Sequence, residues 1–462
     1  MELPKLHNRF DVIIKHIYAK HLNFNTESTW AKNFYSNHIK VFNGFIEDDG
    51  SEKLGKQQFL ETYHKVLESI KINGFDNKLD GIPIGNDGTI INGAHRLAAC
   101  LFYKKQPILK KELINGPKYN FDFFSKRALS SKYLDATAVE YCRINPNAFL
   151  VFLFPSIKEI SEGSLDTLKA AGDVFYEKEI TISKEGQTRL MRQLYKGENW
   201  VGTEKDDFSG AKRKAKWCFQ NKNKVKVLLL NSSLDKLTQA KLDFREIYGL
   251  GKHSIHSTDN HEEVIRIGQQ VFNDNSIHFI NNSKEKNFST YSTLIKEYQE
   301  WLKKFNYDEE IFCLDGSVTM AAYGIRDSRD LDYIHLGEKQ IDCSNKELGN
   351  HNYQLKYHPI NKAELILNPN NYFYYDGVKY ITLDIVKKMK TKRNELKDRH
   401  DIQLIEAFLS GKKEPFILTF KIKLRKVATK TYVFSKLRDI KLFIQMTWIK
   451  FVLFFFSKKE KK

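Results

Sequence analysis

Apolar residues along this chain follow two alternating patterns. Short apolar runs predict strands, and segments with an apolar residue every three or four positions predict helices. The predicted strands cover residues 82–84, 89–91, 148–154, 173–182, 224–230, 311–314, 330–334 and 380–383. The predicted helices cover residues 10–21, 59–71, 97–103, 165–171, 237–248, 262–272, 294–305, 318–323, 384–389 and 402–409. This alternation predicts an α/β (α+β) fold.

Composition sets the broad class of the protein. A length of 462 residues favours two or three domains, and 41% hydrophobic residues suffice for sizeable cores. The five cysteines are scattered without Cys-x-x-Cys spacing, which is typical of reduced thiols in a cytosolic protein. The start of the chain has no apolar core after a basic segment, so we expect no signal peptide.

The positive charge is concentrated at the end of the chain. Residues 411–462 carry 15 Lys and Arg against 3 Asp and Glu, whereas the other 410 residues carry 60 against 54. The body is therefore nearly neutral for its length. Because the basic character belongs to the tail, the overall positive charge is weak evidence for nucleic-acid binding, and we do not expect a nucleic-acid partner.

The stretch from Ile311 to Leu336 carries the clearest chemical pattern. An apolar strand leads into Gly316 and Ser317, a short helix follows, and Asp330 and Asp332 then alternate along the next strand. Alternate residues of a strand share a face, so two carboxylates lie side by side. Such a pair calls for a cation, and oxygen ligands favour Mg²⁺ or Mn²⁺. The amides at the start of the helix are suited to a phosphate.

This pattern resembles the signature of the polymerase-beta-type nucleotidyltransferase fold, with 14 positions from Gly316 to Asp330. The longer pattern Leu314-Asp315-Gly316-Ser317, Gly324-x-Arg326 and Asp330-x-Asp332 is also similar to the LicD/fukutin branch, which decorates glycans with phospho-substituents. A Trp that LicD proteins carry before the acidic cluster is missing here. The alternative is a surface-exposed acidic turn after a strand.

The resemblance implies a role for each matched residue. Asp330 and Asp332 would hold the metal, and Gly316 and Ser317 would grip a phosphate of a nucleoside triphosphate. Arg326 would neutralise developing charge. No obvious third aspartate follows, and Glu364, in the apolar run 363–367, is our candidate for the third metal carboxylate.

A second pattern lies between residues 59 and 108. A helix, a strand at 82–84, an Asp-Gly turn and a return strand lead to Gly93, His95 and Arg96 at the start of a new helix. A glycine, helix amides and an arginine fork together can bind an anion. The order of elements resembles the ParB/sulfiredoxin fold, although Ala94 stands where sulfiredoxins need a cysteine.

The ParB/sulfiredoxin resemblance implies a nucleotide pocket. Free-serine kinases of this fold use an upstream glutamate as base, and Glu47 is the nearest candidate. The alternatives are a retained fold with an inactive pocket, or a purely structural use of His95 and Arg96.

The polar cluster from His253 to Glu263 has two interpretations. His253 and Asp259 are candidate metal ligands and His256 a candidate acid or base. Alternatively, Thr258 or Asp259 caps the helix at 262–272. The same choice between phosphate contact and a solvated basic face applies to two further groups of residues: Lys212–Trp217, and Lys392, Arg393 and Lys397.

The tail from Tyr432 to Phe456 mixes Phe, Leu and Ile with Lys and Arg. It contains no run of the ~20 apolar residues that a spanning helix needs. A basic amphipathic helix with aromatic residues suits an anionic membrane surface, and the alternative is a helix docked on the protein's own core.

We therefore expect four parts: a ParB/sulfiredoxin-like nucleotide-binding module (1–130), an α/β middle region (131–300), a mixed-sheet nucleotidyltransferase-like region (301–415) and a membrane-associating tail (416–462). The expected function is metal-dependent nucleotidyl or phospho transfer to a phosphorylated sugar or glycan in bacterial surface-glycan assembly, in the cytoplasm at the inner face of the membrane. The first alternative is an ATP-dependent kinase of a small hydroxylated metabolite or sugar. The second is a nucleic-acid-binding or toxin-type nucleotidyltransferase.

Overall fold

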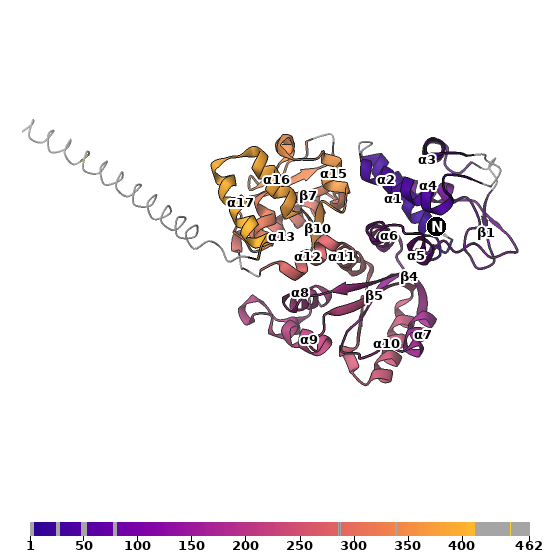
Figure 1. Ribbon diagram of the computed structural model, residues 1–462, viewed down its shortest axis with the longest axis horizontal. Helices are drawn as coiled ribbons and strands as arrows, with labels where there is room; N and C mark the ends of the chain where they lie inside the picture. The colour runs from indigo at the N-terminus through magenta and orange to yellow at the C-terminus, as the bar shows by residue number, and fades with distance from the viewer. Residues whose placement is uncertain are drawn as a thin grey trace, which may run out of the picture. The chain divides into compact units, whose positions relative to one another are not determined.

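The computed structural model describes residues 4–24, 28–47, 53–76, 81–284, 286, 288–337, 340–411 and 444. The chain divides into two units, Met1–Arg393 and Asn394–Lys462. Figure 1 shows helices and strands interspersed along the first of them. Helices and strands are mixed, and the sheets include parallel and antiparallel pairs. The predicted mixture of helices and strands, an α/β (α+β) fold class, is confirmed.

The first part of the larger unit is mainly helical. Its elements are α1 (Phe10–Phe24), α2 (Thr29–Asn43), α3 (Lys56–Asn73), β1 (Ile82–Ile84), α4 (Ala94–Tyr103), β2 (Leu109–Lys111), α5 (Phe121–Lys126) and α6 (Ser131–Ile144). Helix α1 is buried along most of its length because α2, α4 and α6 pack against it. The predicted return strand at 89–91 is reduced to one bridge between Ile84 and Ile90.

The middle part contains a four-stranded sheet in the order β4-β5-β3-β6. Its elements are β3 (Ala148–Leu153), α7 (Glu162–Ala171), β4 (Gly172–Thr181), α8 (Lys184–Leu194), η1 (Asn199–Val201), η2 (Glu204–Asp206), α9 (Ser209–Phe219), β5 (Lys224–Ser232), α10 (Leu234–Tyr248), η3 (Gly251–His253), β6 (Ile255–Ser257), α11 (His261–Val271) and α12 (Asp274–Asn282). All neighbouring strands pair antiparallel, so the alternation of strands and helices produces no parallel crossover here.

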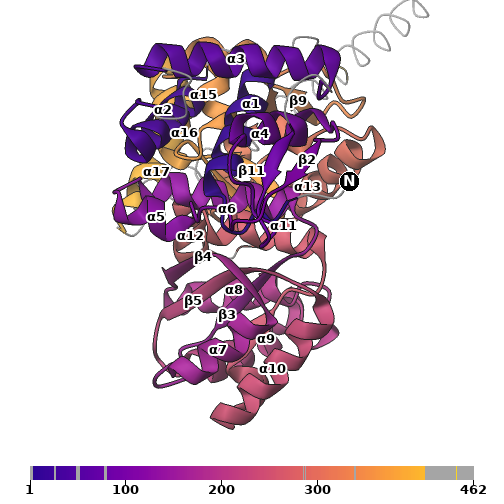
Figure 2. The same ribbon diagram turned by 90° about the vertical axis from the view of Figure 1, so that its right-hand side faces the viewer.

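Both faces of this sheet are covered. Successive side chains of a strand point to opposite faces, and β3 is buried throughout. Phe149 and Val151 pack with residues of α7 and α10, whereas Leu150 and Phe152 join the core that includes α9 and α11. Figure 2 shows α7 and α10 beside β3.

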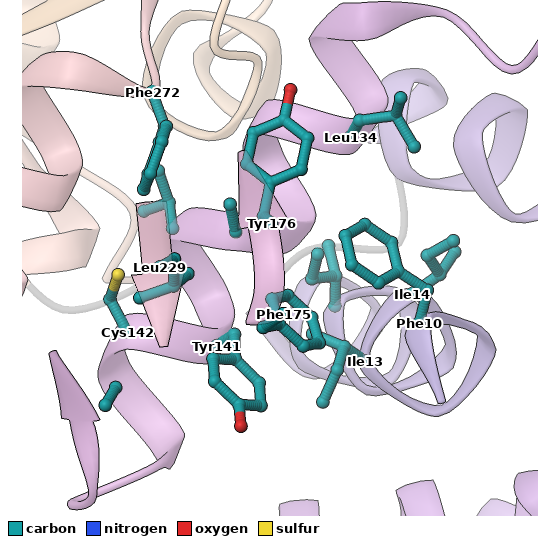
Figure 3. Packing of buried hydrophobic residues seen from close by; sticks show 14 of the residues in the cluster. Phe10, Ile13, Ile14, Leu134, Tyr141, Cys142, Phe175, Tyr176, Leu229 and Phe272 are labelled. Atoms are coloured by element: carbon teal, nitrogen blue, oxygen red, sulfur yellow. The ribbon is translucent and has the colours of Figure 1, made fainter. Parts of the chain in front are cut away.

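The second of these cores also contains the N-terminal helices. Phe10 of α1 stacks on Phe175 of β4 with ring centroids 4.3 Å apart, and Tyr141 of α6 stacks on the same ring at 3.6 Å (Figure 3). Phe175 lies where the β4 register shifts, between Val174 and Tyr176. The predicted parts 1–130 and 131–300 therefore share one core.

The last part of the larger unit is built on a mixed five-stranded sheet in the order β10-β11-β7-β8-β9. Its elements are α13 (Ser289–Lys304), η4 (Glu309–Ile311), β7 (Phe312–Asp315), α14 (Ser317–Ala322), β8 (Leu331–His335), β9 (Leu348–Asn350), η5 (Asn352–Tyr357), α15 (Lys362–Leu367), β10 (Tyr372–Tyr375), β11 (Val378–Ile381) and α16 (Leu383–Arg393). Gly324 has φ +72°, a left-handed conformation that favours glycine, and it follows α14 as predicted.

The smaller unit contains helix α17 (Leu396–Leu409), which begins with a capping box of Glu395 and Asp398. The predicted tail at 416–462 lies outside the described residues except for Ile444. In the part of the chain that the structure describes, no helix has the length and apolar character needed to cross a membrane.

Candidate functional site

Strands β7 and β8 place two carboxylates opposite each other. They pair antiparallel, with Asp315 in register with Asp332, and directly opposed residues lie on the same face of a sheet. Asp315 is fully buried. Asp330 precedes β8 and is exposed. Burial, Asp330 and Asp315 together raise the pKa of Asp332 to about 6, against the opposing effect of His351.

Two histidines that the sequence analysis missed hold Asp315. His351 Nδ1 lies 2.9 Å and His358 Nε2 3.0 Å from the same oxygen, Asp315 Oδ2. Despite burial, these imidazoles keep the pKa of Asp315 well below its usual range, and the Asp315 carboxylate raises the pKa of His351. The other imidazole nitrogen of His351 lies 4.0 Å from Asp332 Oδ2. His351 therefore stands between the two aspartates.

Glycines leave room around the Asp332 carboxylate. A Cβ atom added at Gly316 would lie 3.2 Å from Asp332 Oδ2, and one added at Gly349 would lie 3.3 Å from Asp332 Oδ1. Gly316 also has φ +72°, which strains any other residue. The backbone can therefore approach this carboxylate only because both positions lack a side chain.

Ser317 joins this site through hydroxyl contacts. Its Oγ lies 2.6 Å from Ser328 Oγ and 3.5 Å from Asp330 Oδ1. The electrostatic attraction for a phosphate at the start of α14 is weaker than predicted. The helix has only six residues, and the helix macrodipole grows with the number of aligned peptides. The hydroxyl of Ser317 is the clearer polar group.

The predicted Arg326 lies on the loop before β8, where Nη1 donates to the Asp327 carbonyl at 2.9 Å. Further positive charge comes from α16. Lys390 opposes part of the burial-driven rise in the pKa of Asp332, and Arg393 opposes part of the rise that Asp315 causes in the pKa of His351, so both basic groups act on the site.

Glu364 is not brought to the two aspartates. Its Oε1 accepts hydrogen bonds from the amides of Thr29 and Trp30 and from the Thr29 hydroxyl, at 2.8–3.0 Å. Its Oε2 accepts from Asn368 at 2.9 Å. The carboxylate therefore caps α2, and our assignment of Glu364 as third metal ligand is corrected: it serves a helix N-terminus, where negative charge is stabilising.

The donor set fits a cation that shares its shell with a substrate. Among the described residues, no three His, Cys, Asp or Glu side chains converge to hold a metal ion. Asp315 Oδ1 is buried without a hydrogen-bond partner in the described chain, and Asp332 is held among like charges. Mg²⁺ commonly takes one or two protein carboxylates and completes its shell with phosphate and water.

The N-terminal residues predicted to bind nucleotide do come together. Glu47, Gly93, His95 and Arg96 line one pocket with a volume of about 780 Å³. Glu47 is paired with Lys53 at 3.2 Å. The lining also holds Arg9, Asp11, Lys15 and Arg127, so positive charge predominates.

Sequence analysis missed the buried ion cluster of this pocket. Arg9 and Lys15 contact Asp11 Oδ2 at 2.8 and 3.2 Å. In the sequence, the spacing of Arg9, Asp11 and Lys15 is typical of a solvent-exposed helix start. The three side chains are buried because other helices pack around α1. His95 Nε2 lies 2.8 Å from the Tyr35 hydroxyl, and burial with nearby Lys15 holds the pKa of His95 well below its usual value. His95 is therefore neutral, and the cationic contacts in the pocket come from other side chains.

The polar cluster at 253–263 begins α11, but its cap is neither Thr258 nor Asp259. The Asn260 side chain accepts from the Glu263 amide at 2.9 Å. Thr258 Oγ1 instead accepts from the Leu150 amide. The N-cap of α11 is therefore Asn260, and the predictions of Thr258 and Asp259 as the cap are wrong by two positions and one position.

Comparison with protein-family models, curated proteins and solved structures finds no significant match to this chain.

Proposed function

We propose that this protein is a metal-dependent transferase of nucleotidyl or other phosphorus-containing groups. The observation that carries the proposal is the juxtaposition of Asp315, Asp330 and Asp332 beside Gly316 and Ser317 at one end of β7 and β8. Two-carboxylate sites next to a phosphate-binding hydroxyl are what phosphoryl and nucleotidyl transfer use. The motif resemblance to the nucleotidyltransferase fold supports the same reading.

Each residue has a defined part in this proposal. Asp330 and Asp332 would hold Mg²⁺ or Mn²⁺, which when bound would neutralise phosphate oxygens. His351 is oriented by Asp315 and counters the charge of Asp332. Ser317 would donate its hydroxyl to a phosphate oxygen, and Arg326 with the basic side chains of α16 would stabilise developing negative charge.

The substrates follow from the resemblance. A nucleoside triphosphate would supply the transferred group, and a phosphorylated sugar or glycan would accept it; the glycan acceptor rests on the similarity to LicD-like proteins. The basic aromatic tail would keep the enzyme at the inner face of an anionic membrane. Deletion of residues 432–462 should then release the protein from acidic liposomes, and unchanged sedimentation with liposomes would refute the membrane role.

The test compares metal-dependent nucleotide turnover in three variants. Asp332→Asn and Asp330→Asn should each lose Mg²⁺-dependent release of pyrophosphate or nucleotide in the presence of a panel of sugar phosphates, and should lose the Mg²⁺-induced thermal shift. Glu364→Gln is the matched control, because that carboxylate caps a helix and should leave both readouts unchanged. Wild-type turnover by either aspartate variant would overturn the proposal.

A second activity is favoured by the N-terminal pocket. Its size, its excess of Lys and Arg and the neighbouring Glu47 suit a nucleotide, with the pocket acting either as a nucleotide site or as a ParB/sulfiredoxin-like kinase. Arg96→Ala in the full chain should weaken ATP binding by about 1.5–3 kcal/mol, as for a hydrogen bond to a charged group. Glu47→Gln should abolish kinase activity and spare ATP binding. Calorimetric ATP affinity unchanged by Arg96→Ala would exclude this pocket.

A further inference from the structure

A third cleft lies in the middle part of the chain, apart from both sites above. It opens between α9, α10 and the start of α11, with a volume of about 1210 Å³. Small-molecule pockets are typically about 300–1,000 Å³, so this cleft has room for a monosaccharide derivative with a substituent.

Cationic side chains from two helices converge inside this cleft. Lys214 of α9 and Lys241 and Arg245 of α10 all act on His256, and together with burial they lower its pKa to about 3. Among the lining residues, seven Lys and Arg face four Asp and Glu. Asp259 lies 3.6 Å from Lys241 and offsets only part of this charge.

Several buried polar atoms in the cleft lack a partner. Within the described ranges, Arg245 Nε, His256 Nε2 and Ser257 Oγ are buried without a hydrogen bond. The nearest carboxylate to His256 Nε2 is Glu263 Oε1 at 3.9 Å, which is too long for a hydrogen bond. Buried polar groups are nearly always satisfied in proteins, so these atoms call for water or a bound ligand.

Exposed aromatic faces complete the cleft. Trp217 is 55% exposed and stacks on His253 with ring centroids 5.7 Å apart. Trp200 is 42% exposed, and its ring centroid lies 4.9 Å from that of Tyr195. Exposed tryptophans beside polar groups offer an apolar face on which a ring can stack.

From these features we infer that the cleft binds an anionic sugar: a saccharide ring with a phosphate or carboxylate group. Lys214, Lys241 and Arg245 would hold the anion, and a tryptophan would carry the ring. The carboxylates of Glu198, Asp259, Glu262 and Glu263 accept hydrogen bonds from hydroxyl groups and repel a polyphosphate, which favours a singly substituted sugar over a nucleoside triphosphate. The inference does not depend on the transferase proposal, because no aspartate of that site lines the cleft.

The test measures the binding of defined probes to the full chain by calorimetry and by intrinsic tryptophan fluorescence. Glucose 1-phosphate and glucuronate should bind, whereas glucose and inorganic phosphate should bind at least tenfold more weakly. Lys241→Gln should lower the affinity for glucose 1-phosphate by about tenfold or more, which corresponds to the loss of one charge-assisted hydrogen bond. Trp217→Ala should weaken it by about two- to tenfold.

Matched controls separate a local effect from loss of folding. Lys236→Gln changes an exposed lysine of the same helix α10, and Phe305→Ala removes an aromatic ring exposed to a similar degree elsewhere. Both should bind like wild type, and all four variants should keep the wild-type melting temperature. Equal affinity for inorganic phosphate, no binding of either anionic sugar, or sugar binding insensitive to both cleft variants would each overturn the inference. Wild-type affinity for glucose 1-phosphate in Asp332→Asn would show that the sugar binds independently of the transferase site.

Discussion

Asp315 illustrates how a buried carboxylate is compensated by nearby imidazoles. Its carboxylate has no exposure, yet two imidazoles approach one of its oxygens within 3.0 Å. Because the fold depresses the pKa of Asp315, the ionised form stabilises the folded state above the ordinary pKa of an aspartate, and this contribution disappears as the pH falls below it.

We predict that Asp315→Asn lowers the free energy of unfolding by about 3–5 kcal/mol at neutral pH, because it leaves the two histidines without their anion. Urea unfolding monitored by circular dichroism measures the change. Asp330→Asn, at an exposed neighbouring carboxylate, is the control and should change stability by less than about 0.5 kcal/mol. Equal stabilities of the two variants would contradict a structural role for the Asp315–histidine contacts.

His21 should make the protein sensitive to acid. Burial and the adjacent Lys20 lower the pKa of His21 to about 3. The unfolded chain binds a proton at about pH 6.5, so folding stability must fall as the pH drops from 6.5 toward 3, by up to about 4 kcal/mol.

We predict that His21→Phe reduces this acid dependence, since phenylalanine cannot take up a proton, while His95 and His256 keep their own contributions. The free energy of unfolding should be measured at pH 7 and pH 5 for both proteins. The comparison uses the difference between the two pH values, so any packing change at Trp30, whose ring lies 5.4 Å away, cancels. Identical slopes would show that His21 is not the acid-sensitive group.

At the scale of elements, the contact between α2 and α15 joins segments more than 300 positions apart. The Glu364 carboxylate satisfies two amides at the start of α2 that have no partner within the helix. The Ser28 side chain, at the N-cap position itself, makes no capping hydrogen bond. Capping of this helix therefore depends on a distant segment.

We predict that Glu364→Ala destabilises the protein by about 1–2 kcal/mol, the usual effect of losing a helix cap. Glu364→Gln keeps an acceptor oxygen and should lose about half as much. Thermal unfolding with and without Mg²⁺ gives both stability and metal response. A Mg²⁺-induced shift that disappears in Glu364→Gln would restore a metal-binding role and refute the capping role.

Across the whole of the larger unit, a buried ion network joins its two ends. Lys20 of α1 contacts Glu140 of α6 at 2.6 Å and Glu310 at 2.5 Å, and Arg143 contacts Glu310 at 2.6 Å. With the Phe10 and Phe175 stack, this network ties residues 1–130 to the rest of the chain. Binding experiments on the N-terminal pocket therefore need the full chain.

We predict that Glu310→Gln destabilises the protein by about 1–3 kcal/mol, because the buried Lys20 and the half-buried Arg143 then share the Glu140 carboxylate. Lys20→Met added to Glu310→Gln should cost less than the sum of the single changes, with a coupling energy of about 1–3 kcal/mol. A double-mutant cycle by urea unfolding measures it. Strict additivity would show that Lys20 and Glu310 do not interact energetically.

The amino-acid sequence by itself determined the positions of most elements. Helices α1, α3, α10 and α11 and strands β3, β5 and β7 begin and end within a few residues of the predicted bounds. Their periodicities of 3.6 and 2 residues are local, and so are the glycines that end α10 and α14. The same local pattern placed Gly93, His95 and Arg96 together at the start of α4, whereas their shared pocket with Glu47 depends on the tertiary packing.

Only the tertiary structure decided which side chains meet across long separations. The contacts of Asp315 with His351 and His358, the cap that Glu364 gives α2, and the convergence of Lys214 and Lys241 on His256 each join different elements. No local periodicity encodes such partners, because strand order and register depend on the packing of the whole sheet. The sequence therefore pointed to Asp330 and Asp332, while the fold supplied the buried aspartate and histidine that surround them.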